Sequence, residues 1–298
     1  MRSGPAIPTA GLLQLLGSVV LLGSAWPITK VALAAGAVPA WFAVGRAGLS
    51  CAAAFAVLGL LGRVRLPGRR DWPAVLGVGL GQLAVFFAFA HEAVVYVPAG
   101  RTTILCNVTT IFVAPLSVLV LGEAVPRRRW IAAGLGVLGA AVLMGPWSID
   151  WRAPGVLVGH FLLLGAAFTF SVAIIVVRVR PPALSMLQLL PWCFLVATLA
   201  LLPLALRHGG IGAWPAASVW SMVYIGGFAG PVATWCVMQV AATLPAMVAS
   251  VGLLLTPAAG LALSTWWLGE AFGVDLMAGS VLILAGVSIA AWPAARPR

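Results

Sequence analysis

Two stretches, Leu121-Gly122-Glu123-Ala124 and Leu268-Gly269-Glu270-Ala271, repeat one another along the chain at a distance of 147 residues. The same shift places Val97-Pro98-Ala99 on Leu244-Pro245-Ala246, so the likeness begins well before the shared glutamate. Self-similarity at a fixed spacing is typical of a chain built from repeated structural units. The motif therefore predicts two related halves.

The rest of the sequence is strongly apolar. Hydrophobic residues make up 62% of the 298 residues, charged residues only 8%, and the mean hydropathy is +1.11. A soluble domain needs more charge on its surface, whereas a helix crosses a bilayer with about twenty apolar residues. We therefore expect an all-α integral membrane protein with about ten transmembrane helices. The expected spans are residues 12–35, 39–61, 73–94, 97–120, 130–147, 155–177, 184–206, 218–241, 244–267 and 274–293.

The formal net charge of +11 comes from arginines in alternate breaks between these spans. Cytoplasmic loops of membrane proteins are rich in Arg and Lys, so this pattern indicates orientation and not nucleic-acid binding. We expect a bacterial inner-membrane protein with both termini in the cytoplasm. The cytoplasmic segments would carry Arg2, Arg63, Arg65, Arg69, Arg70, Arg127, Arg128, Arg129, Arg178, Arg180, Arg296 and Arg298.

The repeat divides the chain into residues 1–148 and residues 149–298, with five spans each. Because five is odd, the second half enters the membrane from the opposite side. The loops agree, since Arg127–Arg129 follow the first copy of the motif and Gly273–Asp275 follow the second. Inverted repeats are common in secondary transporters, which bind substrate at the interface between the repeats.

Several motifs resemble the drug/metabolite transporter superfamily, and in particular its ten-helix EamA-type branch. The resemblance rests on Trp26 and Lys30 in the first span, Arg46 in the second, and the stretch from Pro257 to Glu270. Thr110 replaces the matching proline in the first half, where the pattern departs from the family. The resemblance implies an exporter of small metabolites, most like the bacterial aromatic amino-acid exporters.

Charged groups in a membrane are costly and therefore face a cavity or a partner. Five ionisable groups fall in the outer half of the predicted bundle: Lys30, Arg46, His91, Glu92 and Arg101. One interpretation is a structural set in which Glu92 pairs with Arg101 or Arg46. The other is an outer vestibule that attracts the carboxylate of a substrate.

Two helical stripes combine an aromatic ring with an amide. Gln82 and Phe86 are four residues apart in the third span, and Trp235 and Gln239 are four apart in the eighth. Such stripes are often ordinary packing, but an amide facing lipid would lack a partner. We therefore consider both stripes, with Trp26, as candidate walls of a substrate pathway. Glu123 and Glu270 lie at helix ends, where capping or loop ordering is the expected role.

The predicted function is export of small metabolites by alternating access without ATP hydrolysis. The sequence carries no Walker motif, no Cys-x-x-Cys spacing, and no Asp or Glu near the middle of a predicted span. We expect no enzyme activity, no cofactor, no metal, four free cysteines and a monomer that binds a small-molecule substrate. A carrier for another metabolite or drug-like compound stays open, as does an intramembrane enzyme.

Overall fold

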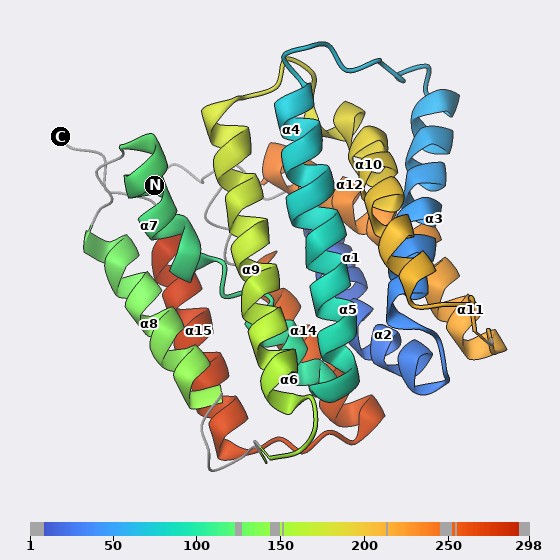
Figure 1. Ribbon diagram of the computed structural model, residues 1–298. Coiled ribbons are helices and arrows are strands. Elements are labelled where there is room, and N and C mark those ends of the chain that lie inside the picture. Colours follow the sequence, from blue (N-terminus) through green and yellow to red (C-terminus); the bar gives the residue numbers. More distant parts are fainter. Residues whose placement is uncertain are drawn as a thin grey trace.

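The computed structural model describes residues 9–122, 127–143, 150, 152–212, 214–244, 252–253 and 255–291 (Figure 1). This part of the chain is mostly helical and contains no β-strand. The helical elements are α1 (Thr9–Gly23), α2 (Ala25–Ala34), α3 (Pro39–Leu60), α4 (Trp72–Leu76), η1 (Gly77–Val85), α5 (Phe86–Tyr96), α6 (Ala99–Leu105), α7 (Thr110–Leu121), α8 (Arg127–Leu143), α9 (Val156–Val179), α10 (Met186–Arg207), α11 (Ala216–Met222), η2 (Val223–Ala229), α12 (Gly230–Thr243), α14 (Leu255–Leu268) and α15 (Val274–Ala291).

Within the described residues these elements form ten segments. Four segments are composite (α1 with α2, α4 with η1 and α5, α6 with α7, α11 with η2 and α12), and the others are single helices. Six helices are long and apolar enough to cross a membrane, namely Thr9–Ala34, Pro39–Leu60, Trp72–Tyr96, Val156–Val179, Met186–Arg207 and Ala216–Val237. Shorter apolar helices accompany them. The predicted all-α fold with many spans is confirmed.

The packing of the helices has the same pattern in both halves. Segments that hold the same position in the two halves pack against each other. The second segments meet through α3 and α10, the fourth through α6 and α14, and the fifth through α8 and α15. The third segment of each half packs against the first segment of the other, through α5 on α9 and α12 on α1. In Figure 1 the chain runs downward through α1 and α2 but upward through α9. The two five-segment halves are therefore inverted repeats, as the odd number of spans predicts.

Each half has one π-helical stretch, η1 in the third segment and η2 in the eighth. A π-helix has wider turns and weaker packing, so it needs support from close neighbours. Glycine, which lacks a Cβ atom, allows that approach. If Gly79 carried a Cβ atom, it would lie 2.9 Å from the carbonyl oxygen of Cys193. A Cβ atom on Gly226 would lie 2.7 Å from the carbonyl oxygen of Arg46. Both π-helices therefore pack tightly on a helix of the opposite half.

The loop between α3 and α4 is tied to the other half through Asp71. Its carboxylate accepts hydrogen bonds from the backbone N–H groups of Gly68 (2.9 Å), Ala183 (2.7 Å) and Leu184 (3.0 Å). These hydrogen bonds, and the burial of the carboxylate among them, fix the loop at the upper end of the bundle in Figure 1. Backbone N–H groups that favour the charged form lower the pKa of Asp71.

Candidate functional site

A cluster of aromatic rings surrounds Arg46 between α2, α3 and α5. The guanidinium carbon lies 4.2 Å from the centre of the Phe87 ring and 5.9 Å from that of Trp26. Its Nη1 atom is 3.3 Å from Nε2 of His91. A guanidinium is attracted to the faces of aromatic rings, so this arrangement accommodates a cation inside an apolar bundle.

His91 lies at the centre of this cluster and is completely buried. Its ring centre is 5.5 Å from Phe42, 5.6 Å from Phe87 and 5.9 Å from Trp26. Nδ1 of His91 has no hydrogen-bond partner among the described residues. The three surrounding rings fix the imidazole beside Arg46, while Arg46 keeps part of its own surface exposed.

Arg46 has no carboxylate partner in the described part of the chain. The acids of that part bind elsewhere, and Asp71 is held by backbone N–H groups as described above. Glu92 accepts a hydrogen bond from the Tyr96 hydroxyl (3.3 Å). The other three carboxylates likewise bind backbone N–H groups or another arginine: Asp150, Glu270 and Asp275. Within the described chain, Arg46 therefore presents to the surrounding rings a positive charge that no carboxylate balances.

The aromatic surface continues from this cluster through Phe86. Its ring centre lies 6.0 Å from that of Trp26 and 5.5 Å from that of Phe170 on α9. Phe170 belongs to the second half, so the rings cross the interface between the repeats. Trp26, Arg46, Phe86 and His91, which the sequence singled out, are thus brought together. Phe42, Phe87 and Phe170 were missed, although Phe87 stands four residues before His91 in the same helix.

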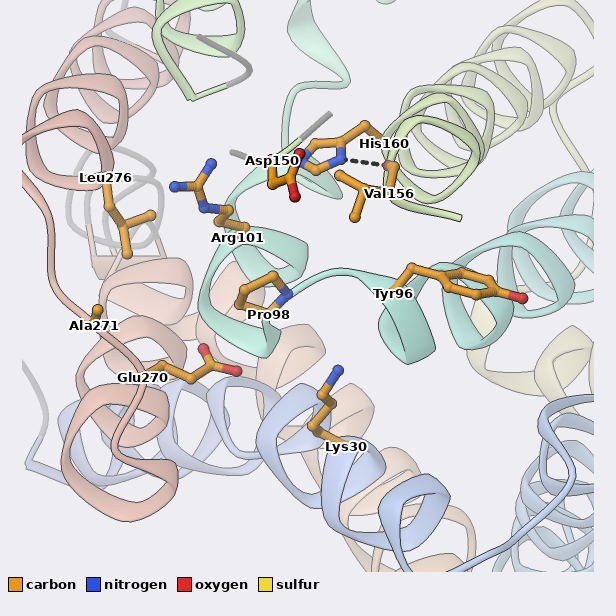
Figure 2. Close-up of a pocket in the computed structure, with 10 residues that line it drawn as sticks. All are labelled: Lys30, Tyr96, Pro98, Arg101, Asp150, Val156, His160, Glu270, Ala271 and Leu276. Atoms are coloured by element: carbon orange, nitrogen blue, oxygen red, sulfur yellow. Dashed lines mark hydrogen bonds between the residues drawn. The ribbon is translucent and has the colours of Figure 1, made fainter. Parts of the chain in front are cut away.

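A second polar region lies at the other end of α5, around the start of α6 (Figure 2). A cavity of about 420 Å³ opens there. It is lined by Lys30, Tyr96, Pro98, Arg101, Asp150, Val156, His160, Glu270, Ala271 and Leu276. Figure 2 shows that these side chains come from α2, α5, α6, α9 and α15, and from the connections that contain Pro98, Asp150 and Glu270.

The cations of this cavity are bound by the protein itself. Nζ of Lys30 donates to the carbonyl oxygens of Val94 (2.5 Å), Val95 (3.2 Å) and Val97 (3.3 Å) at the end of α5. Arg101 donates Nη2 to Asp275 and Nη1 to the Leu143 carbonyl oxygen, both at 2.6 Å. One of the two interpretations, a pairing of Glu92 with Arg101 or Arg46, is therefore wrong. Arg101 binds Asp275, and within the described chain Glu92 binds the Tyr96 hydroxyl and neither arginine.

Glu270 has the expected capping role. Its two carboxylate oxygens accept hydrogen bonds from the backbone N–H groups of Ala99 (2.6 Å) and Gly100 (2.8 Å), the first residues of α6. The first N–H groups of a helix have no partner within the helix, so the carboxylate supplies their acceptor. Its negative charge also interacts favourably with the positive end of the helix dipole. Glu270 thus joins the second half to the first. Glu123, its repeat mate, lies outside the described residues.

The two amide stripes differ in their surroundings. Gln82 lies in η1, where the wider π turn changes its angular relation to Phe86 from the one expected in an α-helix. Trp235 and Gln239 lie in α12, a regular α-helix, and the Trp235 side chain is 44% exposed. Among the described residues, no ring contact or side-chain hydrogen bond joins Trp235 or Gln239 to the rings around Arg46.

Comparison with known proteins identifies the kind of protein to which this fold and site belong. The model of the EamA-like transporter family matches residues 9–145 and again residues 157–292. The chain therefore belongs to the EamA-like transporter family, and it is a membrane transporter built of two repeats.

Relatives extend this finding over most of the chain. A "Probable terminal-alkyne amino-acid exporter" of Streptantibioticus cattleyicolor is 27% identical over 274 residues, covering 91% of this chain and 90% of the relative. The "Uncharacterized transporter YdfC" of Bacillus subtilis is 25% identical over 239 residues, covering 78% and 76%. A solved crystal structure has the same fold, with a TM-score of 0.65 at 20% identity, over 96% of this chain and 99% of that one.

Proposed function

We propose that the protein is a bacterial inner-membrane exporter of amino acids with aromatic or large neutral side chains. Membership of a transporter family supports the transport step, and the amino-acid exporter among the relatives supports the substrate class. The proposal assigns export to alternating access, with a site at the interface of the repeats.

The observation that carries the proposal is the guanidinium of Arg46, which lies among aromatic rings and has no carboxylate partner in the described chain. An arginine binds a carboxylate with two parallel hydrogen bonds, and charge-assisted bonds of this kind are about twice as strong as neutral ones. A substrate carboxylate on Arg46 would leave its side chain beside Trp26, Phe86 and Phe170, where ring contacts contribute about 1 kcal/mol each. The site therefore selects for a carboxylate and an aromatic group together.

Other residues have supporting roles in this proposal. Gln82, Trp235 and Gln239 line the pathway and bind the polar end of the substrate as it moves. Lys30 and Arg101 hold the outer end of the bundle together, since both are already bound to the protein. Residues 1–148 and 149–298 act as the two moving repeats of a monomer with both termini in the cytoplasm.

Transport in this proposal is driven by the gradient of the substrate. The described carboxylates lie in loops or near segment ends, so no mid-membrane acid is offered for proton or sodium coupling. A carrier for other carboxylates is the second candidate, because Arg46 recognises a carboxylate whether or not the molecule also has an amino group.

The experiment is a competition panel in proteoliposomes loaded with radiolabelled phenylalanine. The competitors are alanine, phenethylamine, which lacks the carboxylate, and 3-phenylpropionate, which lacks the amino group. We expect competition by phenylalanine well above that by alanine or phenethylamine. Equal competition by 3-phenylpropionate would favour the general carboxylate carrier, and competition by phenethylamine alone would overturn the role of Arg46.

The variant Arg46→Gln separates this role from folding. It removes the charge but keeps a hydrogen-bond donor beside His91, and it should lower transport of phenylalanine at least tenfold. The matched control is Arg69→Gln, which removes one arginine from an exposed loop and should leave transport unchanged. Thermal unfolding of both variants in detergent checks that each is folded.

A further inference from the structure

A second cavity lies where the end of α3 meets the start of α10, far from the Arg46 cluster along the bundle. Its volume is about 350 Å³. It is lined by Leu58, Gly62, Arg63, Arg65, Ser185, Leu187 and Gln188. The transport proposal uses none of these residues.

Arg63 and Arg65 are the charged groups of this cavity. Both side chains are exposed, and the carboxylates of the described chain are bound to other groups, as set out for Arg46. Asp71, the acid nearest in sequence, is held by three backbone N–H groups. Two arginines on one cavity without a carboxylate indicate a site for an anion.

The opposite wall adds further positive character. The helix α10 begins at this wall, and its 22 residues give its N-terminus a partial positive charge. Ser185 and Gln188 form a capping box, in which the Gln188 side-chain oxygen accepts from the Ser185 backbone N–H at 3.3 Å. This leaves the side-chain N–H groups of Gln188 as donors without an acceptor in the described chain. The Gln188 amide can therefore donate to an anion in the cavity, beside the positive end of α10.

Trp192 of α10 fixes the backbone at the edge of the cavity. Nε1 of Trp192 donates to the Arg65 carbonyl oxygen at 2.9 Å, and the Trp192 ring packs edge-on against Phe55 at 5.1 Å. The backbone that carries the two arginines is therefore anchored to α10 and does not depend on their side chains.

Large apolar side chains lie next to the arginines on the protein surface. Leu60 is 90% exposed, Leu61 59% and Leu66 79%. A free inorganic anion would gain nothing from these neighbours, whereas the acyl chains of a lipid would cover them. Basic pockets beside transmembrane helices bind the head groups of anionic lipids.

We propose that this cavity, named here the Arg63–Arg65 pocket, binds the phosphate head group of an anionic phospholipid. The arginines and Gln188 contact the phosphate oxygens, and the leucines at the end of α3 contact the acyl chains. The proposal is independent of the transported substrate, so it stands or falls separately from the function proposed above.

The test uses the full-length protein in detergent, titrated with phosphatidylglycerol or phosphatidylcholine and followed by native mass spectrometry. The double variant R63Q/R65Q is compared with R69Q/R70Q, which removes the same charge from the same loop outside the pocket. We expect wild type and R69Q/R70Q to bind phosphatidylglycerol in preference to phosphatidylcholine. R63Q/R65Q should bind it at least about tenfold more weakly.

Three outcomes would overturn the proposal. Equal loss of binding in both double variants would mean attraction to the general surface charge. Equal binding of the two lipids would mean that the head-group charge is not recognised. Displacement of phosphatidylglycerol by millimolar inorganic phosphate would assign the pocket to a free anion. Thermal unfolding of each variant, with and without lipid, shows whether a loss of binding comes from loss of the fold.

Discussion

Arg101 and Asp275 form a buried ion pair between the two repeats. Their side chains are 2.6 Å apart and only 10% and 9% exposed. Arg101 lies in α6 of the first half and Asp275 in the first turn of α15 of the second. Together with the Glu270 cap on α6, the pair joins the two repeats at the end of the bundle where α5 ends and α6 begins.

Replacement of Asp275 by Asn should destabilise the protein strongly. Removing one partner of a buried ion pair leaves the other charge uncompensated and costs about 3–5 kcal/mol. The free energy of unfolding in detergent measures the effect. The control Asp150→Asn borders the same cavity but is exposed, so it should change stability by less than about 0.5 kcal/mol. Equal effects of the two variants would mean that the pair does not hold the halves together.

Replacement of Gly226 by Ala should damage the packing of η2 on α3. The added Cβ would lie 2.7 Å from the Arg46 carbonyl oxygen and 3.0 Å from Cβ of Leu49, and overpacking of this kind costs about 1–3 kcal/mol. Gly227 is the matched control, because nothing lies within 4 Å of a Cβ placed there. Unfolding midpoints of the two variants should differ clearly. A G227A variant as unstable as G226A would indicate loss of π-helical flexibility and not a clash.

Acid should weaken the link between the loops that Asp71 holds. Hydrogen bonds from backbone N–H groups lower the pKa of Asp71 from its ordinary value of 3.8. The carboxylate therefore makes its full contribution to stability above pH 3.8. That contribution is lost as the pH falls through the lower pKa of the folded state. Asp71→Asn should therefore unfold with a weaker dependence on pH below about pH 4. Unfolding curves of both proteins that run parallel over this range would contradict the prediction.

The amide stripes predict a change in selectivity. Trp235→Ala should weaken binding of phenylalanine more than binding of alanine, by about 1–2 kcal/mol. The reason is that alanine has no ring that could contact Trp235. Gln82→Leu and Gln239→Leu should lower transport without unfolding, because leucine is well tolerated in apolar surroundings. Competition by the two amino acids in proteoliposomes measures all three variants. Unchanged selectivity in every variant would assign both stripes to helix packing.

The proposed orientation predicts opposite accessibility for the two loops that follow the repeated motif. A cysteine introduced at Arg128 should react with a membrane-impermeant reagent only from the cytoplasmic side, and one at Gly273 only from outside. The native cysteines are buried and free, as the sequence predicted, so they give little background. Labelling of both positions from the same side would contradict the inverted repeat.

The sequence predicted the fold well because its signals are local. Apolar runs of the right length, arginines in alternate loops and a repeated motif determine the segments and their order. The same signals marked Arg46 and His91 as unusual, since both interrupt apolar helices. Their contact across 45 residues, however, depends on how α3 packs against α5, and no local pattern encodes that packing.

The ion pair illustrates what the sequence left out. Closeness in the chain favours Glu92 as the partner of Arg101, but Arg101 binds Asp275, which is 174 residues away. The π-helices were missed for another reason. Glycine-rich apolar sequence is compatible with both α and π turns, and tertiary packing against the opposite half decides between them.

The matched positions of η1 and η2 make the two contacts across the repeats equivalent. The shift of 147 residues that aligns the repeated motif carries Gly77, the first residue of η1, onto Tyr224, the second residue of η2. Each wide turn approaches a helix of the other half through a glycine, Gly79 on α10 and Gly226 on α3. A substitution that loosens one of these contacts therefore has a counterpart in the other half that loosens its mate.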